Sequence, residues 1–218
     1  MRATEDTYRH KGLRRRLVET VRGKGITNER ILTAIENIPR HFFLDSAFDE
    51  VAYEDKAFPI EAGQTISQPY TVAYQTQLLE VKPLEKVLEI GTGSAYQACV
   101  LAEIGAKVFT IERQKKLFDS NKQFHYLKKY HNIKFFYGDG YEGLPTFAPF
   151  DKVLITAAAP IVPVKLITQL KPGGMMVIPF GGGDVQVMKR LIKQADGSVR
   201  EEIYDQFSFV PMLQGKND

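Results

Sequence analysis

The sequence predicts an α/β protein whose doubly wound, mostly parallel sheet follows an N-terminal helical cap and ends in antiparallel C-terminal strands. From residue 86 onward, short β-branched runs alternate with longer helical stretches, as in strands joined by crossover helices. The first 60 residues show helical periodicity instead. We therefore expect a cap at residues 1–62, packed on a main domain at residues 63–213, and a frayed tail at residues 214–218.

The cap is expected to contain two amphipathic helices. Apolar residues recur at helical spacing over residues 11–24 and again over residues 28–38. Residues 42–61 have no clear period and are expected to be irregular. A further helix should begin near Pro69 and lead to Glu80, because proline fits the first turn of a helix.

The main domain is expected to alternate strands with helices. Short runs rich in β-branched and aromatic residues predict parallel strands at 87–90, 107–111, 133–137, 152–156 and 175–180. Between them, helices are expected at 94–104, up to about 130, and at 163–170. The last two runs, 185–192 and 199–210, read as an antiparallel pair around the turn Asp196-Gly197. Strands that alternate with helices favour a sheet covered on both faces.

Composition narrows the class of protein. The net charge of +3 and the 44% of hydrophobic residues indicate a folded domain rather than a disordered chain. The single cysteine, Cys99, excludes an internal disulfide, and the four histidines lack metal-ligand spacing, so we expect no metal. The N-terminus is charged where a signal peptide would be apolar. The longest apolar run, 153–164, contains two prolines and is shorter than the roughly 20 residues of a membrane span. We expect a soluble cytoplasmic protein that does not bind membranes.

A glycine loop follows the first predicted strand of the main domain. The sequence L-E-I-G-T-G-S-A-Y at 88–96 places Gly91 and Gly93 where a strand leads into a helix, so that the backbone can approach a ligand closely. A dinucleotide fingerprint would need a third glycine at the position of Tyr96. The two-glycine form preceded by Glu89 resembles motif I of class I S-adenosylmethionine methyltransferases, which have a Rossmann-like fold.

Two further acidic residues stand at strand ends, where residues that bind nucleotides are usually found. Glu112 ends the second strand, where a carboxylate accepts hydrogen bonds from ribose hydroxyls, and Asp139 follows the third strand within G-D-G. Each feature has a plainer explanation, since the glycines could form only a tight turn, Glu112 could be a charge at a helix N-terminus, and G-D-G is a common turn. Their joint placement at one edge of the sheet favours a cofactor site.

The segment G-Q-T-I-S-Q-P at 63–69 indicates the substrate. On spacing alone, Ser67 could simply be the N-cap of the helix that Pro69 begins. The segment also resembles the active-site signature of protein-L-isoaspartate (D-aspartate) O-methyltransferases, enzymes that repair damaged aspartyl residues. Further blocks of the chain resemble the same family in the same order, from about residue 26 to residue 213. They are N-E-R-I-L-T-A-I-E-N-I-P-R-H-F-F (28–43), F-D-K-V-L-I-T-A-A-A-P (150–160), Q-L-K-P-G-G (169–174), I-P-F-G (178–181) and the strand F-V-P-M (209–212).

The resemblance implies roles for individual residues. Ser67 corresponds to the active-site serine, whose hydroxyl binds the substrate carboxylate and which also borders the cofactor. The other implied cofactor-binding residues are Gln64, Thr65 and Ile66, which fold over the cofactor, Glu89, Gly91 and Gly93 of motif I, Glu112 at the ribose, Asp139 and Gly140 at the adenine, and Gln186 nearby. Ala95 stands where the family usually has glycine, which puts cofactor affinity in question, although alanine suits a helix.

The implied reaction is methyl transfer from S-adenosylmethionine, which becomes S-adenosylhomocysteine, to the free carboxylate of L-isoaspartyl and D-aspartyl residues in damaged proteins and peptides. The resulting ester starts repair through a succinimide. We expect a monomer whose partners are such proteins and peptides, with no nucleic acid. One alternative is a methyltransferase for RNA or a small molecule, suggested by the basic run at 14–24. Another is a catalytically dead methyltransferase fold that serves as a binding module, suggested by Ala95. A nicotinamide oxidoreductase is disfavoured by Tyr96.

Overall fold

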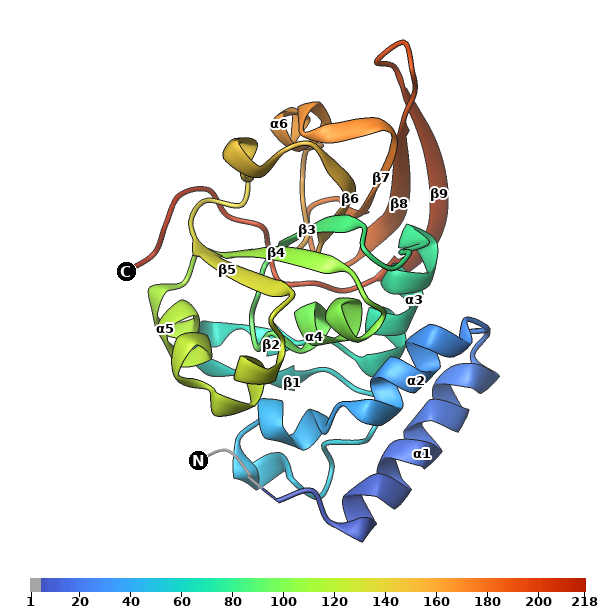
Figure 1. Ribbon diagram of the computed structural model, residues 1–218, viewed down its shortest axis with the longest axis vertical. Coiled ribbons are helices and arrows are strands. Elements are labelled where there is room, and N and C mark those ends of the chain that lie inside the picture. Colours follow the sequence, from blue (N-terminus) through green and yellow to red (C-terminus); the bar gives the residue numbers. More distant parts are fainter. Residues whose placement is uncertain (1–4) are drawn as a thin grey trace.

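A seven-stranded sheet forms the centre of the molecule in the computed structural model, which describes residues 5–218 (Figure 1). The strand order is β5-β4-β3-β6-β7-β8-β9, in which the first five strands pair in parallel, whereas β8 pairs antiparallel with both β7 and β9. The strands are β3 (Lys86–Ile90), β4 (Lys107–Glu112), β5 (Ile133–Tyr137), β6 (Phe150–Ile155), β7 (Leu170–Phe180), β8 (Gln186–Lys193) and β9 (Val199–Phe207). The predicted α/β class, with its antiparallel C-terminal strands, is confirmed.

Helices and irregular segments cover both faces of the sheet. The α-helices are α1 (Tyr8–Gly23), α2 (Glu29–Asn37), α3 (Pro69–Leu79), α4 (Tyr96–Glu103), α5 (Lys115–Gln123) and α6 (Val164–Thr168). One face packs into a core that includes α3, α4 and the two cap helices, and the other packs against α6 and the segments that precede it. The chain winds from β3 toward β5 in one direction and from β6 toward β9 in the other. The order therefore reverses between β3 and β6, which is where open α/β sheets bind ligands.

The cap shares one hydrophobic core with the sheet. Leu17 of α1 and Ile35 of α2 are buried in the same cluster as Cys99 of α4 and Val108 of β4. The division of the chain at residue 62 stays a prediction, because this core runs continuously across it.

Three elements differ from the prediction. The segment 42–61, expected to be irregular, contains β1 (Phe58–Pro59), which forms a short hairpin with β2 (Thr65–Ile66). The helix expected to reach residue 130 ends at Gln123, because Phe124 is extended and packs its ring against Phe43, and a 3-10 turn follows. The segment 209–212 is not a strand: Pro211 forms an isolated bridge with Ala158.

The tail was expected to fray, but the structure shows it hydrogen-bonded to the main domain. The backbone N–H of Asn217 donates to the Arg113 carbonyl over 2.8 Å, and its carbonyl accepts from the backbone N–H of Lys115 over 2.8 Å. The guanidinium of Arg113 also donates to the carbonyls of Gln214 and Gly215. The tail is thus held beside the carboxyl end of β4.

Candidate active site

A cavity lies at the carboxyl ends of the strands, where the strand order reverses. We call it the central cavity; it is lined by residues 64–67, 72, 90–94, 96–97, 111–113, 140, 156–157 and 210–213. These segments follow β2, β3, β4, β5 and β6, which brings parts of the sequence more than 100 residues apart into one wall. Gln64, Thr65, Ile66, Ser67, Gly91, Gly93, Glu112 and Gly140, which the sequence singled out, all line it.

The glycines of the central cavity are required by close packing. Gly91 has φ of 96°, and a Cβ there would lie 2.7 Å from the hydroxyl oxygen of Thr156. That hydroxyl contacts the carbonyls of Ile90 and Gly91 at 2.9 and 2.8 Å. A Cβ at Gly140 would collide with the side chain of Ile90. The loop therefore presents bare backbone to the cavity, as a closely bound ligand requires.

Glu112 lies at the edge of the central cavity with its carboxylate held by backbone donors. Its side-chain oxygens accept from the N–H of Gly93 over 2.8 Å and from the N–H of Gln114 over 2.8 Å. Burial raises the pKa of this carboxyl group, and the backbone donors oppose the shift. Each oxygen keeps a second lone pair, so the carboxylate can accept two further hydrogen bonds, as a ribose diol would offer.

Ser67 lies just before α3 and does not cap it. The N-cap is Gln68, whose side chain makes no capping hydrogen bond, and the helix begins at Pro69. The alternative in which Ser67 serves only as N-cap is therefore wrong. Asp55 from the cap supplies the missing acceptor, since its carboxylate takes the N–H of Tyr70 at 2.8 Å. The Ser67 hydroxyl makes no hydrogen bond to any residue within 5–218 and is free to bind a ligand.

A second cavity adjoins the first. We call it the adjoining cavity; it is lined by residues 24, 57, 65, 67–68, 70–71, 156 and 206–210. Thr65, Ser67, Thr156 and Val210 line both cavities. Three hydroxyl side chains thus lie at the junction of the two cavities. The glycine loop and Glu112 lie on the wall of the central cavity.

Three predicted site residues lie outside the lining. Glu89 is fully buried, and burial raises its pKa to about 8, so this carboxyl group is largely protonated at neutral pH. Asp139 accepts from the N–H of Tyr141 over 2.9 Å and from the N–H of Gly215 in the tail over 2.7 Å. Gln186 is buried, and its carbonyl oxygen accepts from the N–H of Phe209 over 2.8 Å.

One residue of the junction, Thr156, was missed by the sequence analysis. It directly follows a buried apolar strand and carries no chemical signature of its own. The position of Thr156 could nevertheless have been predicted from the sequence. It directly follows the central strand β6, and polar residues at the carboxyl ends of parallel strands lie at the edge of the sheet where ligands bind. Val210 belongs to the segment 209–212, for which the family resemblance implied a place along the substrate groove.

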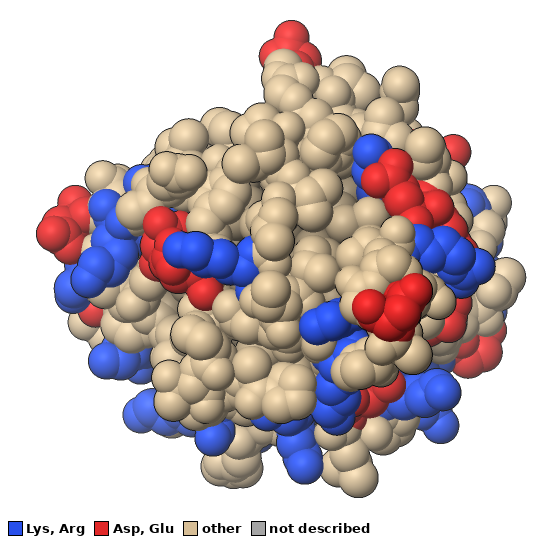
Figure 2. Space-filling model, turned by 90° about the horizontal axis from the view of Figure 1, so that it is seen from above, with Lys and Arg blue, Asp and Glu red and all other residues tan. Residues whose placement is uncertain are grey.

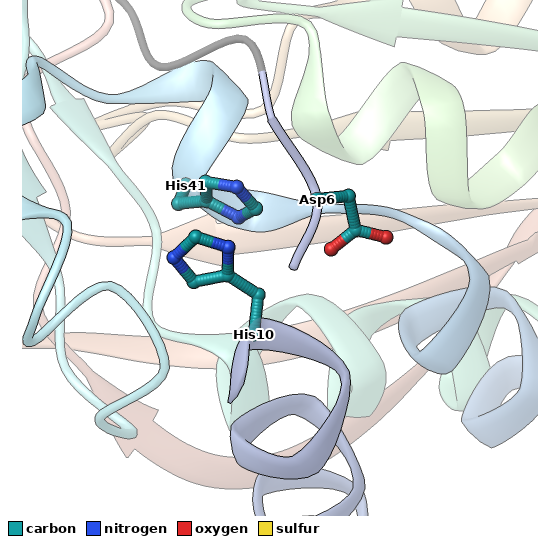
Figure 3. Close-up of side chains that lie close together, drawn as sticks. All are labelled: Asp6, His10 and His41. Carbon is teal, nitrogen blue, oxygen red and sulfur yellow. The ribbon is translucent and has the colours of Figure 1, made fainter. Parts of the chain in front are cut away.

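The fold also brings together Asp6, His10 and His41 in the cap (Figure 3). The two imidazoles stack with ring centroids 3.9 Å apart, and every ring nitrogen already has a protein partner. Asp6 pairs with Arg14 through both carboxylate oxygens at 2.9 Å. Because each ring nitrogen and both Asp6 oxygens are already engaged by protein groups, this cluster is a hydrogen-bonded cap element rather than an open metal site.

The sequence model of the protein-L-isoaspartate(D-aspartate) O-methyltransferase family matches residues 13–217. The chain belongs to this family. Named relatives of the protein-L-isoaspartate O-methyltransferase family cover almost the whole chain. The protein from Christiangramia forsetii is 54% identical over 98% of this chain and 100% of its own, and that from Cytophaga hutchinsonii is 55% identical over 96% and 94%.

Solved structures of protein-L-isoaspartate O-methyltransferases share the fold. One matches with a TM-score of 0.82 and 27% identity, over 91% of this chain and 65% of its own longer chain. A second, a putative enzyme of this family from Plasmodium falciparum in complex with S-adenosyl-L-homocysteine, matches with a TM-score of 0.79 and 22% identity, over 92% and 98%. The family resemblance predicted from the sequence is confirmed.

Proposed function

We propose that this chain transfers a methyl group from S-adenosylmethionine to the free carboxylate of L-isoaspartyl and D-aspartyl residues in damaged proteins and peptides, which starts their repair through a succinimide. One observation carries the proposal. The signature segment of the family forms the shared wall of two cavities, with Ser67 at their junction. A methyl donor in the central cavity would then face a carboxylate that enters through the adjoining cavity.

The central cavity fits S-adenosylmethionine by its shape and its donor set. Gly91, Gly93 and Gly140 line the cavity with backbone, and Glu112 offers carboxylate lone pairs for a ribose. Asp139 stays proposed as the adenine contact, because each of its oxygens keeps a lone pair beside Gly140. Glu89 and Gln186 would act indirectly, by supporting the loop after β3 and the segment 209–210. When bound, S-adenosylmethionine supplies the electrophilic methyl group and leaves as S-adenosylhomocysteine.

Ser67 orients the substrate rather than activating it. An isoaspartyl residue presents an α-type carboxyl group with a pKa of about 3.5, so it is ionised at pH 7 and needs no general base. The side chains at the junction agree with this, because they are hydroxyls and one valine. No histidine contacts Ser67 within residues 5–218, so the hydroxyl has no base to make it a nucleophile. Catalysis then depends on holding the carboxylate in line with the methyl group.

The test uses two peptides that differ only in isoaspartate or aspartate at one position. Each is incubated with the protein and labelled S-adenosylmethionine, and base-labile methyl ester is counted. We expect label on the isoaspartyl peptide alone. Label on neither peptide, with S-adenosylhomocysteine binding intact, would point to another methyl acceptor, and loss of that binding would favour the inactive module.

Two variants separate the roles at the site. Ser67→Ala should lower methyl transfer strongly while S-adenosylhomocysteine affinity in a titration stays within about twofold, since the hydroxyl serves the carboxylate. Asp139→Ala should weaken that affinity first. An Asp139→Ala protein with unchanged affinity would remove Asp139 from the cofactor site.

The basic run at residues 14–24 gives little support to an RNA substrate. Most of its cations are paired: Arg14 with Asp6 at 2.9 Å, Lys24 with Asp55 at 2.6 Å, and Arg22 with Glu29. On the face that carries α6 and the β8–β9 turn, basic and acidic side chains lie next to each other around uncharged surface (Figure 2). Membership of the family favours the isoaspartyl substrate.

Two of the sequence predictions await measurement. None of the helices within residues 5–218 combines the length and the apolar character needed to span a bilayer. The expected cytoplasmic location stays a prediction, and so does the monomer, which light scattering after size-exclusion chromatography would test.

A further inference from the structure

Arg40 is a fully buried cation in the cap whose hydrogen bonds go to backbone carbonyls. Its side-chain exposure is 0%, and within residues 5–218 no carboxylate lies at ion-pair distance from it. Its Nε donates to the carbonyl of Ala52 over 3.1 Å, and its Nη2 donates to the carbonyls of Lys56 and Ser67 over 3.2 and 3.0 Å. Burial lowers its pKa to about 10, which still leaves the guanidinium charged at neutral pH.

These hydrogen bonds join the cap to the residue at the junction of the two cavities. Ala52 and Lys56 belong to the irregular part of the cap, whereas Ser67 belongs to the signature segment. Asp55, between them, caps α3 through the N–H of Tyr70. The turn from Ser67 into α3 is therefore held from outside, by one cation and one anion of the cap.

The Ser67 hydroxyl depends on this support because no side chain holds it. Its oxygen has no hydrogen-bond partner within residues 5–218, so the backbone of Ser67 determines where the hydroxyl can reach. The planar guanidinium donates in a fixed geometry, and the carbonyl of Ser67 is one of its three acceptors. If that carbonyl rotates, the hydroxyl moves with it.

We propose that Arg40 is a positioning residue for methyl transfer, which holds Ser67 at the junction of the two cavities without touching either ligand. The inference rests on the proposed function. Arg40 is absent from the lining of both cavities and reaches the central one only through Tyr96, whose ring lies 5.0 Å from its guanidinium, so its effect should be much larger on turnover than on cofactor affinity. A displacement of about 1 Å of a positioned group can lower a rate by about 100-fold.

The test replaces Arg40 by lysine, which keeps the charge but cannot donate to three carbonyls in fixed directions. Arg14→Lys is the matched control, because Arg14 is also buried and binds Asp6 and Tyr53, but contacts nothing in the signature segment. We expect Arg40→Lys to lower kcat about 10- to 100-fold with S-adenosylhomocysteine affinity within about twofold. Arg14→Lys should keep kcat within about twofold of wild type, even if its Tm falls by as much as that of Arg40→Lys.

Three outcomes would overturn the proposal. They are a wild-type kcat in Arg40→Lys, an equal loss of kcat in both variants, or a loss of cofactor affinity that matches the loss of kcat. If the lysine variant does not fold, the same measurements on Arg40→Gln decide, because its neutral amide can still donate to one carbonyl.

A second readout does not depend on catalysis. Amide hydrogen exchange of residues 68–72 should speed up in Arg40→Lys and stay unchanged in Arg14→Lys. If the wild-type protein fails to methylate the isoaspartyl peptide, the proposed function fails, whereas this exchange pattern still shows whether Arg40 holds the segment. Unchanged exchange in Arg40→Lys would contradict the positioning role itself.

Discussion

Ala95 has a left-handed backbone, with φ of 70° and ψ of 11°, directly before α4. The sequence analysis placed it in a helix, where alanine is favourable, and that expectation was wrong. A non-glycine residue in this conformation costs roughly 1–2 kcal/mol. Its methyl group is fully buried and does not line the central cavity, so the cost falls on folding rather than on cofactor binding.

The variant Ala95→Gly should therefore change little. It relieves the backbone strain but gives up about 0.8 kcal/mol of buried methyl and roughly 0.5–1 kcal/mol of chain entropy. We expect the free energy of unfolding to stay within about 1 kcal/mol of wild type and S-adenosylhomocysteine affinity to be unchanged. Ala98→Gly in the middle of α4 is the control and should destabilise by about 1–2 kcal/mol. Tighter cofactor binding in Ala95→Gly would show that the methyl group obstructs the site.

Buried His41 makes the stability of the cap depend on pH. The Nε2 of His41 can donate to the Glu5 carbonyl, and the Tyr53 hydroxyl, which already accepts from Arg14, can donate to Nδ1, a pattern that suits the neutral ring. Burial lowers the pKa of His41, whereas an unfolded histidine titrates near 6.5. Below about pH 6.5 the unfolded chain binds more protons than the folded one, and stability falls with falling pH.

Thermal unfolding at pH 5 and pH 7.5 checks this. The Tm should be lower at pH 5, and His41→Gln, which cannot titrate, should show a smaller difference between the two pH values. His131→Gln replaces an exposed histidine and should keep the wild-type difference. An equal pH response in all three proteins would assign the effect to other groups.

At the scale of elements, the C-terminal tail closes one end of the central cavity. Met212 and Leu213 line the cavity, and the residues that follow bind Arg113 and Asp139 at its rim. The sequence analysis expected a frayed end because the tail is polar and short. The tail is held through its backbone groups, which bond to Arg113, Lys115 and Asp139 and leave no trace in composition.

Nested truncations test the tail. A chain that ends at Leu213 loses the contacts of Gly215 to Arg113 and Asp139, and its S-adenosylhomocysteine affinity should fall several-fold. A chain that ends at Gly215 keeps these contacts and should bind more tightly than the shorter chain. Wild-type affinity in both would show that the tail only packs.

The same scale shows which elements a sequence can reveal. Strands β3, β4, β5 and β6 could be predicted from the sequence, because buried parallel strands appear as short apolar runs between helices. The hairpin of β1 and β2 could not be predicted, because two strands of two residues each show no periodicity in the sequence. Glu112 and Ser67 were found through motifs, whereas Thr156 and Arg40 owe their places to contacts across the fold.

At the scale of the whole molecule, one core unites the cap and the sheet. Ile35 of α2 is 0% exposed and belongs to the same cluster as the buried residues of α4 and β4. A loss of packing in the cap should therefore lower the stability of the entire chain, as in a cooperative two-state transition.

Ile35→Ala tests this cooperativity. We expect about 2–5 kcal/mol of destabilisation and a single transition in which far-ultraviolet circular dichroism and tyrosine absorbance fall together at a lower Tm. Ile161→Ala, at a residue that is 58% exposed, should leave the Tm nearly unchanged. Two separate transitions would instead show that residues 1–62 fold as an independent unit.

The wall between the two cavities has a thermodynamic consequence. Thr65, Ser67, Thr156 and Val210 border both spaces, so whatever fills one of them changes the surface offered to the other. Any such coupling is reciprocal: the factor by which a nucleoside ligand alters peptide affinity is the factor by which the peptide alters nucleoside affinity. An exchange of spent for fresh cofactor thus bears on the release of the methylated chain as much as on the capture of the damaged one.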